Sequence, residues 1–246
     1  MTAPILGIRF SPLNAVEIAN EVCAEEPVGA FRLVVTANID HIANLSVNSE
    51  FRAAYGDAWL ATIDGTPVHL YARLVGRRDL PKVPGSDLLP LIADRLRPGV
   101  HRPFFVASGP ATTDALRRKL LNRGFDEGSI GTAVPEFGFE ADGADLLRAI
   151  VDHGTTHLFM GVGAPKSEIW MHKHRMALVH CYGFGFGAGL DYTAGTRRRA
   201  PEMLRAMGLE WAWRALSEPR RLPQRYARAL WGFGLAVLND MRTSRG

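Results

Sequence analysis

The sequence predicts an α/β fold with a doubly wound, mostly parallel, Rossmann-like sheet, followed by a basic, amphipathic helical appendage. Short apolar runs that suit buried strands alternate with helix-length segments about six times, and no internal repeat interrupts this order. Charge is segregated as well, because residues 197–246 contain 11 Arg, no Lys and 4 acidic residues. Their net charge of +7, within a total of +4, leaves −3 for the 196 residues before them. We therefore expect an α/β domain at 1–196 and a separate basic element at 197–246.

The stretch 32–41 is the segment around which the other elements are placed. An apolar run rich in β-branched residues ends there in the polar sequence Thr36-Ala37-Asn38-Ile39-Asp40-His41, and apolar residues at helical spacing follow. This is the strand-to-helix step of a parallel sheet, and ligands bind such sheets at the carboxyl ends of the strands. The next predicted strand, 58–63, ends at Asp64-Gly65. We therefore expect Asp64 to share a pocket with Thr36 and Asn38.

Capping residues, glycines and prolines mark where the remaining helices and strands begin and end. Asn14 precedes Glu17 by three residues, the spacing of a capping box. Thr66-Pro67 opens a helix because proline is tolerated in the first turn. The predicted helices are 14–26, 38–48, 49–55 capped by Ser49, 66–74, 87–96 capped by Ser86, 112–122, 145–153 and one that runs from Pro165 to Arg175, and the further predicted strands are 103–108, 131–134, 157–162 and 178–186.

The composition is that of a folded protein in a reducing compartment. Hydrophobic residues make up 47% of the chain, and the two cysteines are far apart in sequence, so they form no disulfide framework. We find no signal peptide and no run of about 18 apolar residues that would span a membrane. These features predict a cytoplasmic protein.

Two glycine-containing segments are candidate anion sites. Gly85-Ser86-Asp87 can offer free backbone N–H groups at a helix start, although its spacing alone favours a plain helix start. Gly161-Val162-Gly163-Ala164-Pro165-Lys166 begins like a dinucleotide fingerprint, but Lys166 stands where the third glycine should be and no acid follows at the required distance. An NAD site is therefore not expected. The open helix start beside Lys166 still suits a phosphate or a carboxylate.

The sequence offers acid–base chemistry more readily than metal or covalent chemistry. It has no Asp-x-Asp, Cys-x-x-Cys, His-Glu-x-x-His or Gly-x-Ser-x-Gly pattern, so we expect no bound metal, no cofactor and no serine nucleophile. Asp64 can take a proton from a hydroxyl at the end of a strand, or it can simply cap the helix that follows. Of the eight histidines, His41 is the one placed near this site.

Eight short motifs, in order along nearly the whole chain, resemble those of the WecG/TagA/CpsF family of bacterial glycosyltransferases. They are Thr36-x-Asn38-x-Asp40-His41, Asp64-Gly65, Gly85-Ser86-Asp87, Gly163-x-Pro165-Lys166-x-Glu168, Asp191-Tyr192-x-Ala194-Gly195, Arg199-Ala200-Pro201, Gly208-Leu209-Glu210-Trp211 and Glu218-Pro219-Arg220-Arg221.

The resemblance implies an inverting, metal-independent transfer of a sugar from a UDP-sugar to a polyprenyl-diphosphate-linked saccharide, in the synthesis of a cell-surface polysaccharide or a teichoic-acid-type polymer. The donor in this family is commonly UDP-N-acetylmannosamine or its uronate. By the same resemblance Asp64 is the base toward the acceptor hydroxyl, Thr36 is a second catalytic residue and Asn38 contacts the donor. The other expected substrate-binding residues are His41, Lys82, Gly85, Ser86, Asp87, Gly163, Pro165, Lys166, Ser167, Glu168, Asp191, Arg214, Arg221 and Arg225.

Two positions depart from the family pattern and bear on the donor. Ser167 stands where the family often has Gln, and Lys82 stands where it often has Arg. We expect Ser167 in the first turn of an exposed helix start. A serine reaches less far than a glutamine and offers no amide, and a lysine is a point charge where arginine is a bidentate fork. The aminosugar preference of the family therefore does not carry over directly.

The basic segment suggests a membrane surface as a partner. Aromatic and apolar residues alternate with arginines there at helical spacing, as in amphipathic helices that bind anionic lipid. The alternatives are that the same residues pack on the α/β body or form a homo-oligomer contact. A nucleic-acid-binding protein and a nucleotide-binding regulatory module without chemistry are the competing classes, but no known nucleic-acid-binding module is present. We expect no nucleic acid partner and a peripheral location on the inner face of the cell membrane.

Overall fold

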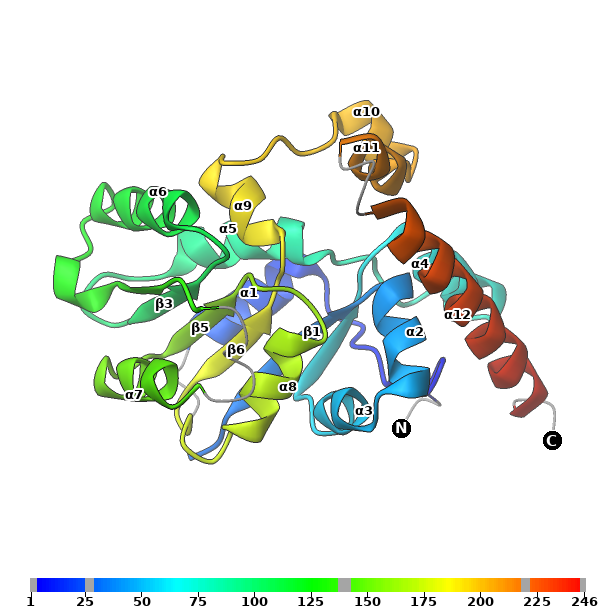
Figure 1. Cartoon of the computed structure of the whole chain (residues 1–246), viewed down its shortest axis with the longest axis horizontal. Coiled ribbons are helices and arrows are strands. Elements are labelled where there is room, and N and C mark those ends of the chain that lie inside the picture. Colours follow the sequence, from blue (N-terminus) through cyan, green and yellow to red (C-terminus); the bar gives the residue numbers. More distant parts are fainter. Residues whose placement is uncertain (1–3, 25–28, 137–142, 218–221, 244–246) are drawn as a thin grey trace.

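Six parallel strands form one sheet in the order β2-β1-β6-β5-β3-β4 in the computed structural model, which describes residues 4–24, 29–136, 143–217 and 222–243 (Figure 1). The α/β fold with a mostly parallel sheet is confirmed. All strand pairings among the described residues are parallel. The strands are β1 (Arg32–Ala37), β2 (Leu60–Ile63), β3 (Pro103–Val106), β4 (Gly131–Ala133), β5 (His157–Met160) and β6 (Tyr182–Gly185).

The register of the sheet brings the ends of β1 and β2 together. Thr36 lies opposite Thr62 and Ala37 opposite Ile63. The ladder continues one residue further, because the backbone N–H of Asp64 donates to Ala37 O at 2.8 Å. The residues after each strand therefore leave the sheet on the same edge, as the sequence predicted for Asp64 and Asn38.

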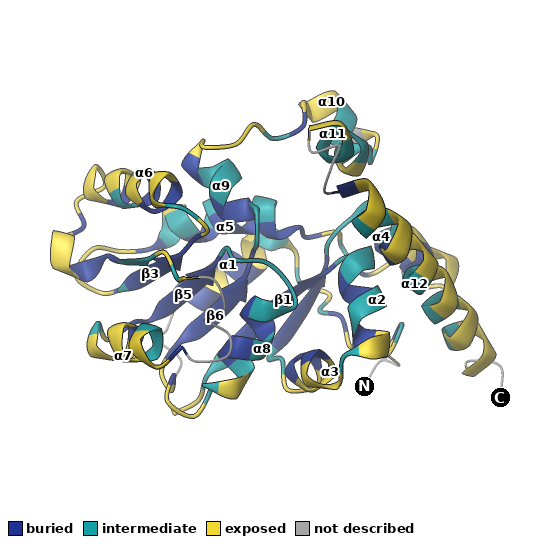
Figure 2. Cartoon of the chain, in the orientation of Figure 1, coloured by how far each residue is buried: buried dark blue, intermediate teal, exposed yellow. Residues whose placement is uncertain are grey.

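Helices cover both faces of the sheet, each over its own apolar core (Figures 1 and 2). Side chains of β1 alternate between the two cores, Leu33 and Val35 to one and Val34 to the other, as a strand buried on both faces requires. The first core holds residues of α2 (Ile39–Val47), α3 (Ser49–Gly56), α4 (Thr66–Leu74), α7 (Ala144–Asp152) and α8 (Lys166–Lys173), and the second holds residues of α1 (Ala15–Ala24), α5 (Gly85–Arg95), α6 (Pro110–Leu121) and α9 (Gly189–Ala194).

The C-terminal part forms α10 (Glu202–Ala206), α11 (Glu210–Ser217) and the long helix α12 (Leu222–Thr243). α12 packs along α2, and the contact is close, since a Cβ added to Gly232 would lie 2.6 Å from the Cβ of Ala43. At its far end Asp240 accepts hydrogen bonds from the Tyr71 hydroxyl and the Leu6 backbone N–H, each at 2.8 Å. α12 is thus joined to the α/β body at several points along its length.

The outer side of α12 remains exposed and apolar. Large hydrophobic side chains at 37% to 73% relative exposure lie along it, interspersed with Arg228 and Arg242. Within the described ranges no helix is both long enough and apolar enough to cross a membrane. The exposed hydrophobic residues of α12 are Leu230, Trp231, Leu235, Leu238 and Met241.

Three local predictions need correction. α3 is capped by Asn48, which accepts from the Phe51 N–H at 2.9 Å, and not by Ser49. α5 begins two residues earlier than predicted, with Pro84 and not Ser86 at the N-cap and no side-chain cap. The segment after β6, predicted only as a glycine-rich turn, contains the short helix α9, which closes at Gly195 in the left-handed conformation.

Candidate active site

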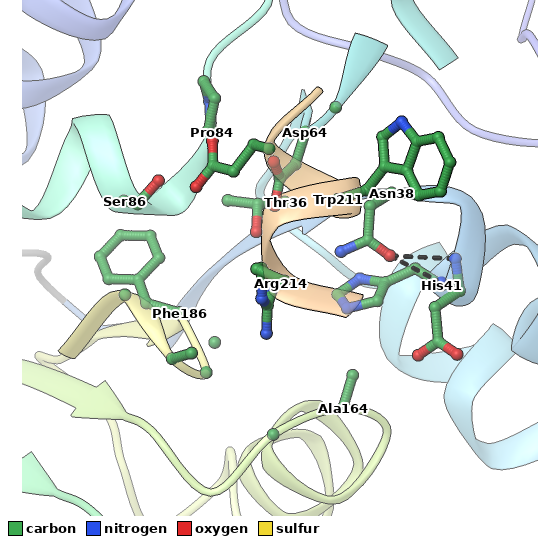
Figure 3. A pocket seen from close by; sticks show the side chains of 18 of the residues that line it. Thr36, Asn38, His41, Asp64, Pro84, Ser86, Ala164, Phe186, Trp211 and Arg214 are labelled. Atoms are coloured by element: carbon green, nitrogen blue, oxygen red, sulfur yellow. Dashed lines mark hydrogen bonds between the residues drawn. The ribbon is translucent and has the colours of Figure 1, made fainter. Parts of the chain in front are cut away.

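A cavity of about 380 Å³ lies at the carboxyl ends of the strands, between the sheet edge and the C-terminal helices (Figure 3). Twelve of the predicted site residues line it. They come from the end of β1, from the segments after β2 and β5, from the start of α5 and the segment before it, from the first turns of α2, α8 and α9, and from α11 and α12. They are Thr36, Asn38, His41, Asp64, Lys82, Ser86, Gly163, Lys166, Glu168, Asp191, Arg214 and Arg225.

Asn38 links the start of α2 to Asp64. Its side-chain oxygen accepts the backbone N–H groups of Asp40 at 3.0 Å and His41 at 3.2 Å, the geometry of a helix N-cap (Figure 3). Because the oxygen is used in this way, the amide nitrogen is left to donate elsewhere. It faces Asp64, where its hydrogen bond lowers the pKa of the carboxyl.

The Asp64 carboxyl is held in a buried, mixed-charge environment. Burial is the largest influence and raises its pKa from 3.8 to about 6, and the negative charge of Glu210 acts in the same direction. Arg214 and the Asn38 hydrogen bond oppose this rise. At neutral pH Asp64 is therefore mostly ionised, but it is a stronger base than an exposed aspartate.

Thr36 and Lys82 are fixed by the sheet. Thr36 is buried as the last but one residue of β1, opposite Thr62. The Thr62 hydroxyl in turn donates to Val83 O at 2.8 Å. Lys82 pairs with Ile63 as an isolated parallel bridge, so the ladder of β2 places its ammonium-bearing side chain beside the pocket.

His41 is neutral in this site. Its Nδ1 and the Tyr55 hydroxyl are hydrogen-bonded at 2.6 Å, and both residues are buried. Burial is the main reason that the pKa of His41 falls to about 4, the nearby Arg225 adds to the fall, and Asp40 opposes it. His41 thus offers a polar ring to the pocket and no positive charge at neutral pH.

Arginines of the C-terminal segment complete the pocket. Arg214 of α11 lines it, and its Nε has no hydrogen-bond partner among the described residues. Burial works against its charge, but the negative groups Asp64 and Glu210 help to raise its pKa above the ordinary value. Arg225 of α12 donates to Asp40 Oδ2 at 2.6 Å and so joins α12 to the start of α2.

Arg199 connects the segment before α10 to the body. It pairs with Asp87 Oδ1 at 2.6 Å and with Glu210 Oε1 at 3.3 Å, and it donates to Ser86 O at 3.3 Å. These contacts explain why Asp87, a predicted substrate-binding residue, is engaged outside the pocket wall.

Besides Asp87, three predicted residues within the described ranges do not line the pocket, namely Gly85, Pro165 and Ser167. Gly85 lies beneath Phe186, since a Cβ there would come within 2.6 Å of the Phe186 ring, and Pro165 follows a cis peptide bond just before α8. The exposed position expected for Ser167 is wrong, because its side chain is fully buried and its hydroxyl donates to Gly163 O at 3.3 Å. Arg221 lies outside the described residues.

Sequence reasoning missed several pocket residues. Glu210 and Trp211 lie in a motif that the sequence had already singled out, but no role was assigned to either. The sequence predicts amphipathic helices where Trp211 and Tyr226 lie, and in the structure these two residues line the pocket with their rings in an edge-to-face contact at 6.3 Å. Across the described part of the chain, no group of three or more His, Cys, Asp or Glu side chains is placed to hold a metal ion.

Comparison with known proteins identifies the family to which the chain is similar. The model of the glycosyl transferase WecG/TagA/CpsF family matches residues 3–246. The chain is 27% identical over 194 residues to an N-acetylglucosaminyldiphosphoundecaprenol N-acetyl-beta-D-mannosaminyltransferase of Bacillus spizizenii, covering 78% of this chain and 73% of that protein. It is 23% identical over 221 residues to a protein of the same name from Staphylococcus aureus, covering 89% and 85% of the two chains.

Proposed function

The chain belongs to the WecG/TagA/CpsF family of glycosyltransferases, and from that premise we propose that it moves a hexose from a UDP-sugar to a polyprenyl-diphosphate-linked saccharide. The transfer is inverting and needs no metal. Relatives that match most of the chain are named for the transfer of N-acetylmannosamine to an undecaprenyl-diphosphate-linked N-acetylglucosamine. The product would feed a cell-surface polysaccharide or a teichoic-acid-type polymer.

The observation that carries this proposal is the buried Asp64 carboxyl, with its raised pKa, in a pocket that also holds Arg214. In a single displacement the acceptor hydroxyl oxygen attacks the anomeric carbon while Asp64 takes the hydroxyl proton. The bond between the anomeric carbon and the diphosphate oxygen breaks, and UDP leaves with the bonding electrons. A base positioned in this way accelerates such a step by about 10²–10⁴-fold.

Basic side chains of the pocket suit the departing diphosphate. Arg214 and Lys82 line the same cavity as Asp64, and Lys166 stands at the start of α8. A guanidinium in a partly buried pocket binds phosphate oxygens more strongly than one in open water, because less screening solvent is present. These residues can thus supply the positive charge that a metal ion supplies in other glycosyltransferases.

The donor hexose is N-acetylmannosamine or a related hexose. Lys82, where the family often has Arg, lines the pocket, so it can act on the donor directly. Ser167 lies behind the pocket wall, so its effect on the donor runs through the backbone of Gly163 that it contacts. A shift of donor within the hexoses would fit these two departures.

The C-terminal helices have two parts to play in this proposal. Their inner sides carry Arg214, Arg225 and Tyr226 to the pocket of the 1–196 domain. The outer side of α12, apolar with interspersed arginines, suits the interface of an anionic membrane, where the lipid-linked acceptor lies. The enzyme would then act as a peripheral protein on the inner face of the cell membrane.

Turnover with a panel of UDP-hexoses and a polyprenyl-diphosphate N-acetylglucosamine acceptor tests the proposal. We expect release of UDP and an extended lipid-linked product, with the same rate in EDTA as in Mg²⁺. Binding of UDP without turnover of any hexose would favour a regulatory nucleotide-binding module instead. Loss of turnover in EDTA, restored by Mg²⁺ or Mn²⁺, would exclude the metal-independent mechanism.

A further inference from the structure

Glu168, in the first turn of α8, is a buried acid in the wall of the pocket with one oxygen unused. The residue is 1% exposed, and its Oε2 has no hydrogen-bond partner among the described residues. Buried polar atoms in folded proteins nearly always have a partner, and an unsatisfied one destabilises the fold. The proposed mechanism assigns Glu168 no part.

The sheet makes room for this carboxyl. Gly185, at the end of β6, has no side chain, and a Cβ added there would collide with Glu168 Oε1. Any other residue at position 185 would therefore displace the acid from the floor of the pocket. The glycine and the glutamate together hold a carboxyl group at the ends of β5 and β6.

Two neighbours of Glu168 bond to other residues. The positive charge of Arg225 lowers the pKa of Glu168, but its Nη2 donates to Asp40 Oδ2. Tyr55, on the neighbouring α3, is hydrogen-bonded to His41. Neither group is hydrogen-bonded to Oε2, and Glu168 is one of the residues that line the cavity.

The chemistry of the acid selects the kind of partner. Burial is the largest influence on the pKa of Glu168 and raises it to about 7, with Asp40 adding to the rise and Arg225 opposing it. The carboxyl thus exists in both protonation forms near neutral pH. A hydroxyl group can donate to the ionised form and accept from the protonated form, whereas a phosphate group would be repelled by the ionised form.

We propose that Glu168 is a sugar-recognition residue, which binds a hydroxyl group of a sugar ring in the pocket through Oε2. This inference rests on the proposed glycosyltransferase function. Three rings can supply the hydroxyl, namely the ribose of the nucleotide, the transferred hexose and the terminal sugar of the acceptor. In each case the bond relieves the unsatisfied oxygen only when the correct ring is bound, so Glu168 contributes to specificity.

The test uses the full-length protein with Glu168→Leu, which removes both oxygens at similar volume, and Glu168→Gln, which keeps one acceptor. Calorimetric titration gives the affinity for UDP and for the best UDP-hexose of the panel, and steady-state kinetics give KM for the acceptor. We expect Glu168→Leu to weaken one of the three by about 10- to 100-fold, and Glu168→Gln to weaken the same one less. The control is Glu50→Gln, the same charge change at an exposed position on α3.

The quantity that changes in the Glu168 variants identifies the sugar ring that Glu168 binds. A loss already present with UDP assigns the ribose, a loss seen only with UDP-hexose assigns the transferred hexose, and a raised acceptor KM assigns the acceptor sugar. The melting temperature of the unliganded variants should be unchanged or higher, because an unsatisfied buried carboxyl has been removed.

A purely structural role for Glu168 predicts a different pattern. Both variants would then melt at lower temperature, and all three affinities would fall together or stay as in the wild type, and either result would overturn the inference. If the wild-type protein binds no UDP-hexose, the proposed function itself is rejected. This result does not depend on the Glu168 variants. The two failures are therefore distinguishable.

Discussion

The Asn38 side chain faces two ways, because its oxygen caps α2 while its amide nitrogen hydrogen-bonds the carboxyl of Asp64. The cap fixes which end of the amide points at the acid. A residue needed to start a helix thereby also keeps the pKa of Asp64 lower than burial alone would set it. The helix start and the proposed base are parts of one arrangement.

The first prediction separates these two uses of Asn38. Aspartate caps helices as well as asparagine does, so Asn38→Asp should leave α2 in place. It removes the N–H donor and adds a second negative charge beside Asp64, and both effects raise the pKa of Asp64. The acid limb of the kcat/KM profile, expected near pH 6 in the wild type, should move to higher pH. An unmoved acid limb would show that Asp64 is not the group that titrates in catalysis.

The second prediction concerns Asp64 itself. Asp64→Asn keeps the shape of the side chain but cannot take a proton, so turnover should fall by about 10²–10⁴-fold while UDP still binds. Calorimetry with UDP provides the control for folding and binding. If the purified variant keeps more than about a tenth of wild-type turnover, which is far above that range, the base lies elsewhere.

The third prediction uses the same variant to test the pKa of Asp64 through stability. The folded-state pKa of about 6 exceeds the ordinary 3.8, so the folded protein binds more protons between these values and loses stability as pH rises through that window. Asp64→Asn has no such loss. Its free energy of unfolding should exceed that of the wild type by about 1–3 kcal/mol at pH 7.5, and the difference should shrink toward pH 4. A difference that does not depend on pH would argue against a raised pKa.

The fourth prediction tests the contact between α12 and α2. A methyl group at Gly232 would press on Ala43, so Gly232→Ala should destabilise the protein by about 1–2 kcal/mol and reduce turnover by displacing the pocket residues of α12. Gly234, two residues on, has open space around it. Gly234→Ala is the matched control and should stabilise the helix by up to about 1 kcal/mol. Equal effects of the two changes in denaturant unfolding would mean that α12 is not held on α2 in solution.

The fifth prediction tests the outer side of α12. Arg214 and Arg225 belong to the pocket, so reversing them would disturb the site itself. Arg228 and Arg242 are exposed, and reversing both to Glu should weaken binding to anionic vesicles in a salt-dependent way, at about 1 kcal/mol per residue, with turnover of a soluble acceptor retained. The charge-matched control is Arg118→Glu with Arg148→Glu, at exposed positions of α6 and α7 on the side of the molecule opposite α12 (Figure 1). If the wild type ignores anionic vesicles at low salt, this side of α12 has another partner.

Local signals account for what the sequence could predict. The Asn14 cap is an example. The Glu17 backbone N–H donates to Asn14 Oδ1 at 3.1 Å, and the Asn14 backbone N–H donates to Glu17 Oε2 at 2.7 Å, as the capping-box spacing predicted. Strand ends and turns likewise follow from short patterns of residues. The placement of Asp64 beside Asn38 needed only the rule that parallel strands end at one edge.

Contacts between distant parts of the chain could not be predicted in this way. Arg225 and Asp40 are 185 residues apart, and nothing in either segment marks the other as its partner. The burial of Ser167 depends on how α8 lies against the sheet. The room for the Glu168 carboxyl depends on the missing side chain of Gly185, which only the folded sheet brings beside it.

α12 also has a mechanical consequence. A helix of 22 residues is a rod about 33 Å long, pinned at its start by Arg225, midway by Gly232 and near its end by Asp240. A partner that binds the outer side of this helix is therefore held at a fixed distance from the pocket and at a fixed angle to it. If that partner is a bilayer, the protein acts as a ruler, and the acceptor can react only when its sugar stands at the distance from the lipid surface that the rod sets.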